Sequence, residues 1–125
     1  MRWTVSLILL LIACSAHAEL PSASSAVISQ ALSSGKPVVI DLGSRSCNAC
    51  KKMAPILEGL ASEYRGKASV LFIDVHEDQA AAKRFKVQMI PTQIFFNTQG
   101  KEIKRHIGAM EKADIVRELK TAGLR

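Results

Sequence analysis

Residues 38–50 read VVIDLGSRSCNAC, and the rest of the chain is interpreted outward from this stretch. Its first part, residues 38–42, is an apolar and β-branched run interrupted by one acid, which is typical of a buried strand. Cys47 then opens a long pattern of apolar residues at three- and four-residue steps, which predicts a helix that ends at Gly66. A strand followed by such a helix places two cysteines at one end of the strand.

The two cysteines, Cys47 and Cys50, lie one turn apart at the N-terminus of the predicted helix. Unpaired backbone N–H groups and the positive end of the helix dipole stabilise a thiolate there. The pKa of such a thiol falls to between about 3.5 and 7.5, so it is a nucleophile near neutral pH. The second thiol is close enough to attack a mixed disulfide and release the partner. The spacing therefore predicts thiol–disulfide exchange, for which we expect no cofactor.

Other uses of a cysteine pair are weaker alternatives. A zinc site needs two more ligands, and beyond residue 18 the chain offers only His76 and His106 besides carboxylates, with no second paired motif. Lys51 follows the pair where covalent haem attachment needs a histidine. An inert structural disulfide is the remaining alternative, and a loop this short is a strained place for one. We therefore prefer redox exchange and expect no metal.

Periodicity and turn residues predict the remaining elements. We expect three more helices, over residues 21–34, 79–85 and 111–121, and three more strands, over residues 70–75, 92–96 and 101–107. In the last strand, Ile103, His106 and Ile107 are predicted to turn inward. This order predicts one α/β domain over residues 19–125, with a mixed sheet covered by helices on both faces.

Several residues around the cysteine pair resemble the thioredoxin family. Asp41 lies six residues before Cys47 and Pro55 eight after it, residues 90–92 (Ile-Pro-Thr) stand where the family has its cis-proline segment, and Gly100 and Gly108 match glycines of the terminal hairpin. The resemblance extends from about residue 36 to residue 119. It implies a thioredoxin fold, with a central mixed sheet of four to five strands.

The resemblance also implies a role for each of these residues. Cys47 and Cys50 would be the catalytic pair, and the buried acid Asp41 would take or return the proton of Cys50. Ile90, Pro91 and Thr92 would bind an extended segment of a protein substrate, with Pro91 in the cis form. The alternatives are that Asp41 is only a hydrogen-bonded acid at a strand end and that Pro91 is an ordinary turn proline.

The chain departs from the family pattern close to the cysteines. Ser46 stands where the family usually has tryptophan, and Asn48-Ala49 replaces the usual glycine-proline. Gly43 stands where a second aromatic is common, and Val70 replaces a lysine that often neighbours the buried acid. These departures leave the reduction potential and the range of substrates open.

The first eighteen residues have the pattern of a secretory signal. One positive charge precedes an apolar run over residues 4–13, which is too short to span a bilayer, and Ala16-His17-Ala18 predicts cleavage before Glu19. Leu11-Ile12-Ala13-Cys14 also resembles the lipobox of bacterial lipoproteins, in which Cys14 would carry the lipid. We prefer the cleaved signal, and therefore a periplasmic protein; the alternative is a lipoprotein anchored to the membrane and facing the periplasm.

These observations together predict a periplasmic reductase of protein disulfides. The size leaves no room for the helical insertion of exported oxidases or the dimerisation domain of isomerases, and the Ile90-Pro91 pair resembles that of the reducing branch of the family. Family resemblance also implies an electron donor embedded in the membrane. Two alternatives remain: a copper metallochaperone using the two cysteines with His76 or His106, and a non-catalytic binding module. A nucleic-acid partner is not expected, because the net charge of +6 is spread along the chain and aromatic residues make up only 5%.

Overall fold

The computed structural model describes residues 19–125 of the chain. The predicted signal segment, including Cys14, lies outside the described residues. None of the helices in the described part is long and apolar enough to cross a membrane.

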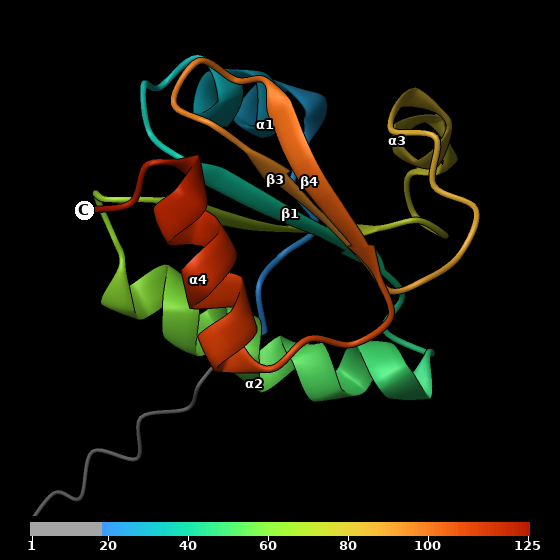
Figure 1. Ribbon diagram of the computed structural model, residues 1–125. Coiled ribbons are helices and arrows are strands. Elements are labelled where there is room, and N and C mark those ends of the chain that lie inside the picture. The colour runs from blue at the N-terminus through green and yellow to red at the C-terminus, as the bar shows by residue number, and fades with distance from the viewer. Residues whose placement is uncertain (1–18) are drawn as a thin grey trace, which may run out of the picture.

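Four strands form one mixed sheet in the order β2-β1-β3-β4 (Figure 1). Strand β1 (Val38–Gly43) is parallel to β2 (Ser69–Asp74) and antiparallel to β3 (Thr92–Phe96). Strand β4 (Glu102–Ile107) pairs antiparallel with β3. The predicted mixed sheet is thus confirmed, with four strands in residues 19–125.

Helices cover both faces of the sheet, as expected. Helices α1 (Ser25–Leu32) and α3 (Gln79–Arg84) lie on one face, and α2 (Asn48–Glu63) and α4 (Lys112–Ala122) lie on the other (Figure 1). Each face has its own apolar core, formed with α1 by Ile28, Val38, Ile40, Leu42 and Ile94, and with α2 and α4 by Val39, Met53, Leu60, Phe95 and Ile115. Because both faces are covered, every residue of β1 and β3 is buried.

The segment before α1 is not helical, and the predicted helix over 21–34 was too long. Ser24 is the N-cap of α1, because its side chain accepts a hydrogen bond from the backbone N–H of Val27. The residues before it run along the edge of β2 instead. Ser22 forms a bridge to Phe72, and the backbone N–H of Ala23 donates to the carbonyl of Phe72 at 2.7 Å. The open edge of β2 offers these residues backbone partners that a longer helix would not supply.

The prediction that β4 turns Ile103, His106 and Ile107 inward was wrong. Ile103 is 40% exposed and Ile107 is 58% exposed, while His106 is half-buried. Strand β4 lies at the sheet edge, and α4 packs against β1 and β3. The pairing of β4 with β3 also shifts register between Phe95 and Phe96. The outer strand therefore has less cover than its apolar residues suggest.

Candidate active site

Cys47 and Cys50 lie at the N-terminus of α2 and are joined by a disulfide, with their Cα atoms 5.1 Å apart. Cys47 is the N-cap residue, and its Sγ accepts a hydrogen bond from the backbone N–H of Cys50 at 3.3 Å. Cys50 is buried at 5% exposure, whereas Cys47 is only half-buried. The two sulfurs are therefore not equivalent: the first faces solvent at the positive end of a helix, and the second lies behind it.

The loop before Cys47 is held by hydroxyl groups. The hydroxyl of Ser44 lies 2.9 Å from that of Ser46 and 3.1 Å from Nδ1 of His76. The backbone N–H of Cys47 donates to the carbonyl of Ser44 at 3.3 Å. Ser46, which stands where the family usually has tryptophan, is thus part of a hydrogen-bonded loop with Ser44.

Asp74, at the end of β2, anchors the same loop and was missed by the sequence analysis. Its Oδ2 accepts a hydrogen bond from the backbone N–H of Arg45 at 3.3 Å. Its Oδ1 accepts hydrogen bonds from the backbone N–H groups of His76 at 2.8 Å and Glu77 at 3.3 Å. Burial opposes ionisation of Asp74, but these backbone hydrogen bonds outweigh it and hold its pKa below the ordinary value. The sequence feature that could have identified Asp74 is its position at the end of an apolar strand, just before a polar turn.

Asp41, on β1, is fully buried. Its Oδ1 accepts a hydrogen bond from Nε2 of Gln93 at 2.8 Å, and Gln93 is also fully buried, on β3. Within residues 19–125, neither Oδ2 of Asp41 nor Oε1 of Gln93 has a hydrogen-bond partner. Burial raises the pKa of Asp41 to about 6, against the opposing effect of the Gln93 hydrogen bond. An acid with this pKa both accepts and returns a proton near neutral pH.

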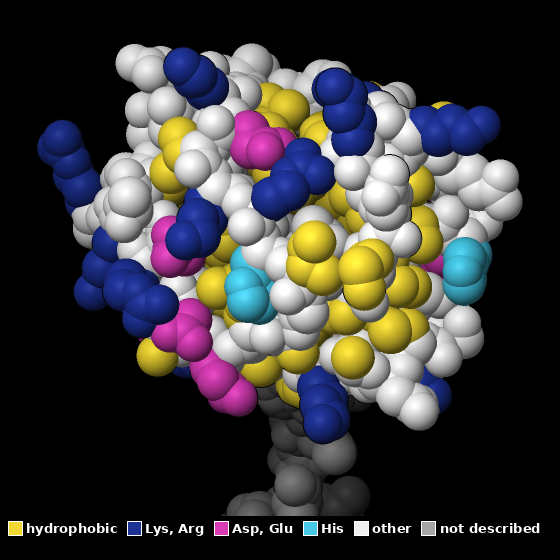
Figure 2. All heavy atoms as spheres, turned by 45° about the vertical axis from the view of Figure 1, so that its right-hand side comes forward, with side chains coloured by type: hydrophobic (Ala, Val, Ile, Leu, Met, Phe, Trp, Pro, Cys, Tyr) yellow, Lys and Arg dark blue, Asp and Glu magenta, His cyan; other side chains and the backbone are white. Residues whose placement is uncertain are grey.

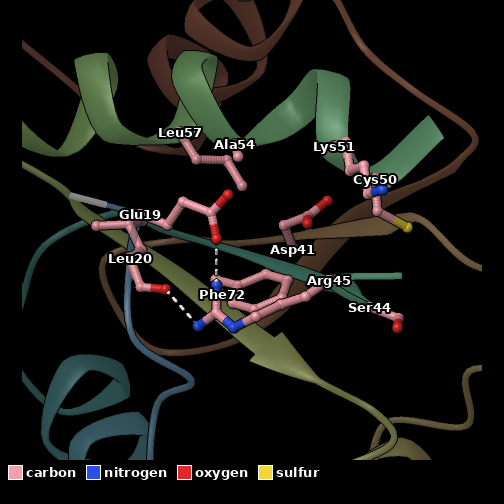
Figure 3. A pocket seen from close by; sticks show the side chains of 10 residues that line it. All are labelled: Glu19, Leu20, Asp41, Ser44, Arg45, Cys50, Lys51, Ala54, Leu57 and Phe72. Atoms are coloured by element: carbon pink, nitrogen blue, oxygen red, sulfur yellow. Dashed lines mark hydrogen bonds and ion pairs between the residues drawn. The ribbon is translucent and has the colours of Figure 1, made fainter. Parts of the chain in front are cut away.

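The side chains of Asp41 and Cys50 both lie beside Gly43. A Cβ atom at Gly43 would lie 3.1 Å from Sγ of Cys50 and 3.4 Å from Oδ2 of Asp41. Both side chains line a small cavity of about 30 Å³ that is partly open to solvent. Figure 3 shows the Asp41 carboxylate pointing from β1 towards α2, on which Cys50 lies. The structure thus brings together the acid and the second cysteine predicted from the sequence.

Arg45 ties the N-terminal segment across this cavity. Its guanidinium donates to the carboxylate of Glu19 at 2.8 Å and to the carbonyl of Leu20 at 2.9 Å (Figure 3). It also lies over the ring of Phe72, 5.0 Å from the ring centre. All four residues line the cavity, so the segment before α1 forms part of its wall.

Ile90, Pro91 and Thr92 lie at the same end of the sheet as the cysteine loop, because Thr92 pairs with Leu42 near the end of β1. The Ile90–Pro91 peptide bond is cis. The carbonyl of Pro91 accepts from the backbone N–H of Gly108 at 2.8 Å, and the hydroxyl of Thr92 donates to the carbonyl of Met89 at 2.6 Å. These bonds fix the segment between β3 and the end of β4.

An apolar groove runs beside this segment. Met89 and Ile107, which are 62% and 58% exposed, line it together with Val87, Thr92 and Arg105. Figure 2 shows hydrophobic side chains gathered on the side of the molecule that carries α3 and this loop, with Lys and Arg side chains around them.

The histidines do not join the cysteines. His76 contacts the hydroxyl of Ser44, and Nε2 of His106 lies 3.3 Å from the carbonyl of Ala109. In the described part of the chain, no three His, Cys, Asp or Glu side chains are grouped so that they could hold a metal ion.

Comparison with known protein families matches residues 21–121 to the family described as thioredoxin. The chain belongs to the thioredoxin family. It is 42% identical over 88 residues to the thioredoxin of Mycobacterium bovis, covering 70% of this chain and 75% of that protein. It is 43% identical over 88 residues to a bifunctional thioredoxin reductase/thioredoxin of Mycobacterium leprae, of which it covers only 19%.

A solved structure shares the fold. A point-mutant thioredoxin from Halobacterium salinarum superposes with a TM-score of 0.73 at 24% identity, covering 85% of this chain and 91% of that one. The predicted thioredoxin fold is thus confirmed. Thioredoxins exchange thiols and disulfides, so this chain is a disulfide oxidoreductase whose redox pair is Cys47 and Cys50.

Proposed function

We propose that this protein is exported and reduces disulfides of other proteins in the periplasm. The observation that carries the proposal is the inequality of the two sulfurs, because Cys47 caps α2 at the surface while Cys50 is buried behind it. A reductase needs this arrangement: one sulfur that reaches a partner and another that completes the exchange.

The reaction begins with the reduced pair. The Cys47 thiolate attacks one sulfur of a substrate disulfide, and the other substrate sulfur leaves with the bonding electrons. Cys50 then loses its proton to Asp41 and attacks Sγ of Cys47, which releases the second substrate sulfur as a thiolate. The substrate gains two electrons and the protein is left with the Cys47–Cys50 disulfide. The pKa of Asp41, raised by burial to about 6, suits it to accept this proton and later give it up.

The groove beside Ile90 is the proposed seat of the substrate segment. Its exposed apolar side chains, Met89 and Ile107, supply apolar contact area for such a segment. An extended segment lying across residues 90–92 would bring its disulfide towards Cys47. The direction of electron flow rests on the resemblance of Ile90-Pro91 to the reducing branch of the family.

The exported location rests on the pattern of residues 1–18. In that compartment a membrane-embedded donor would restore the dithiol after each turnover. Mass spectrometry of the mature protein checks the location: an N-terminus at Glu19 supports cleavage, and a lipid-modified Cys14 supports the anchored alternative. A chain that keeps Met1 in the cytoplasm contradicts export.

The activity itself is tested by trapping. With Cys50→Ser, the mixed disulfide between Cys47 and a substrate cannot be resolved, so covalent complexes should accumulate; Cys47→Ser is the matched control and should trap nothing. The reduced wild-type protein should also reduce insulin disulfides. A reduction potential like that of strong protein oxidants, together with no insulin reduction, contradicts the reductase assignment.

A further inference from the structure

Asp41 and Gln93 form a buried pair that is joined by a hydrogen bond and not by packing alone. The two residues face one another in the antiparallel pairing of β1 with β3, and both are fully buried. Nε2 of Gln93 donates to Oδ1 of Asp41, while Oε1 of Gln93 has no partner in the described chain.

An amide in this position is costly for stability alone. A buried polar atom without a hydrogen bond costs about 1–3 kcal/mol. An apolar side chain of similar size would fill the same place between Thr92 and Ile94 without that cost. A role of Gln93 in the chemistry of Asp41 would account for an amide at this position.

The geometry supplies such a role. Gln93 occupies Oδ1, and so it leaves Oδ2 as the oxygen that is free to bind a proton. Oδ2 is also the carboxylate oxygen closest to this site. A Cβ atom at Gly43 would lie 3.4 Å from Oδ2 and 3.1 Å from Sγ of Cys50. The free oxygen and the sulfur thus approach the same small space from β1 and from α2.

We propose that Gln93 is a positioning residue for disulfide exchange, which holds the Asp41 carboxylate by Oδ1 so that Oδ2 takes the proton of Cys50. The inference deepens the proposed function and rests on it for the identity of the step. When Cys50 attacks Sγ of Cys47, its S–H proton moves to Oδ2, directly or through a water in the cavity. A new S–S bond forms, and the bond from Cys47 to the partner breaks with its electron pair on the leaving sulfur.

Other charged groups near Asp41 do not replace Gln93. The titratable or charged residues that line the same cavity are Glu19 and Arg45 at its mouth and Cys50 and Lys51 on α2. In residues 19–125 the only hydrogen bond to the Asp41 carboxylate comes from Gln93. The effect of removing it should therefore appear directly in the titration of Asp41.

The test uses Gln93→Met, which keeps the length of the side chain and removes the donor. A hydrogen bond to a charged group shifts the pKa of that group by about one to two units, so the Asp41 pKa in the variant should rise by that amount, as followed by carboxyl-carbon NMR of the oxidised protein. Ile94→Val, a fully buried neighbour on the same strand, is the control and should leave this titration unchanged.

The proton-transfer step is measured with an aromatic disulfide reagent, DTNB, that releases a coloured thiolate twice: once when Cys47 attacks it and again when Cys50 attacks the mixed disulfide. At pH 7 the second release should be roughly two- to tenfold slower in Gln93→Met, because more Asp41 is already protonated, and it should recover at pH 9. The first release should not change.

The outcomes separate the two proposals. A wild-type protein that never shows the second release contradicts the proposed reductase chemistry. A wild-type protein that shows it, with a Gln93→Met variant whose Asp41 titration and second-release pH profile match wild type, overturns the role of Gln93 alone. A slow second release that persists at pH 9, or that Ile94→Val reproduces, also overturns it, because it indicates a general packing defect.

Discussion

The backbone of Gly43 packs directly against the side chain of Cys50. A Cβ atom at Gly43 would lie 3.1 Å from Sγ and 3.3 Å from Cβ of Cys50, which is closer than ordinary contact. Gly43 stands where the family resemblance leads one to expect an aromatic side chain. The missing side chain leaves the second sulfur and the Asp41 carboxylate facing a shared space instead of being separated by a bulky group.

Filling this space should perturb the active site. Gly43→Ala is expected to destabilise the oxidised protein by about 1–3 kcal/mol, because the new methyl group crowds Cys50, and to slow its attack on a mixed disulfide. Urea denaturation and the two-step release assay measure these effects. Gly59→Ala is the matched control: nothing lies within 4 Å of its Cβ position in α2, so it should stabilise by about 0.5–1 kcal/mol. Equal effects of the two substitutions would contradict the crowding.

Asp41 should make the oxidised protein less stable as the pH rises. The folded state keeps the Asp41 proton up to about pH 6, whereas an ordinary aspartate loses it near 3.8, so folding takes up a proton between these values. Stability is therefore lost as the pH rises through this window, by at most about 3 kcal/mol. Asp41→Asn should exceed wild type by about 2–3 kcal/mol in urea denaturation at pH 8 and match it closely at pH 4. A difference that is the same at both pH values would show that Asp41 is not the group responsible.

The groove beside the loop before β3 should matter for proteins and not for small reagents. Met89→Ser and Ile107→Ser each remove an exposed apolar side chain, and each loss should raise KM for a protein disulfide about fivefold, since covering part of such a side chain is worth about 1 kcal/mol. Reaction with the small disulfide DTNB should stay unchanged. Val27→Ser, on the exposed side of α1, is the control and should affect neither reaction. If Val27→Ser has the same effect, the groove is not the substrate site.

Arg45 should contribute more to stability than an ordinary surface ion pair. It binds Glu19, the carbonyl of Leu20 and the face of Phe72, so Arg45→Ala is expected to cost about 1–2 kcal/mol in urea denaturation. Arg117→Ala breaks a similarly short, exposed ion pair with Asp114 on α4 and should cost less than about 0.5 kcal/mol. Equal costs would mean that the N-terminal segment is not held across the cavity.

The sequence was most informative where periodicity and backbone chemistry agree. The apolar runs at residues 38–42 and 92–96 correspond closely to β1 and β3, which are central strands covered on both faces. The cysteine spacing located the helix start, because an N-cap position and an exchange-competent sulfur need the same place on the chain. These features depend on neighbours in sequence, which a single sequence supplies.

Features that depend on distant parts of the chain were missed. Gln93 is a polar residue in an apolar strand, and its partner is apparent only from the register that places it opposite Asp41 on β1. The exposure of Ile103 and Ile107 follows from the edge position of β4, which periodicity does not report. The segment from Glu19 to Ala23 joins the edge of β2 by backbone bonds and by Arg45, so its residue types carry little signal.

The central claim is that Cys47 ionises readily and is reachable while Cys50 is held back. The most direct measurement is the rate at which iodoacetamide alkylates each thiol of the reduced protein between pH 5 and pH 9, read by mass spectrometry of the two modified forms. We expect Cys47 to react at least about tenfold faster than Cys50 and to keep its reactivity below pH 7, since the helix terminus stabilises its thiolate. Two thiols that react equally slowly, each only as the pH approaches 8.5 or above, would contradict the account.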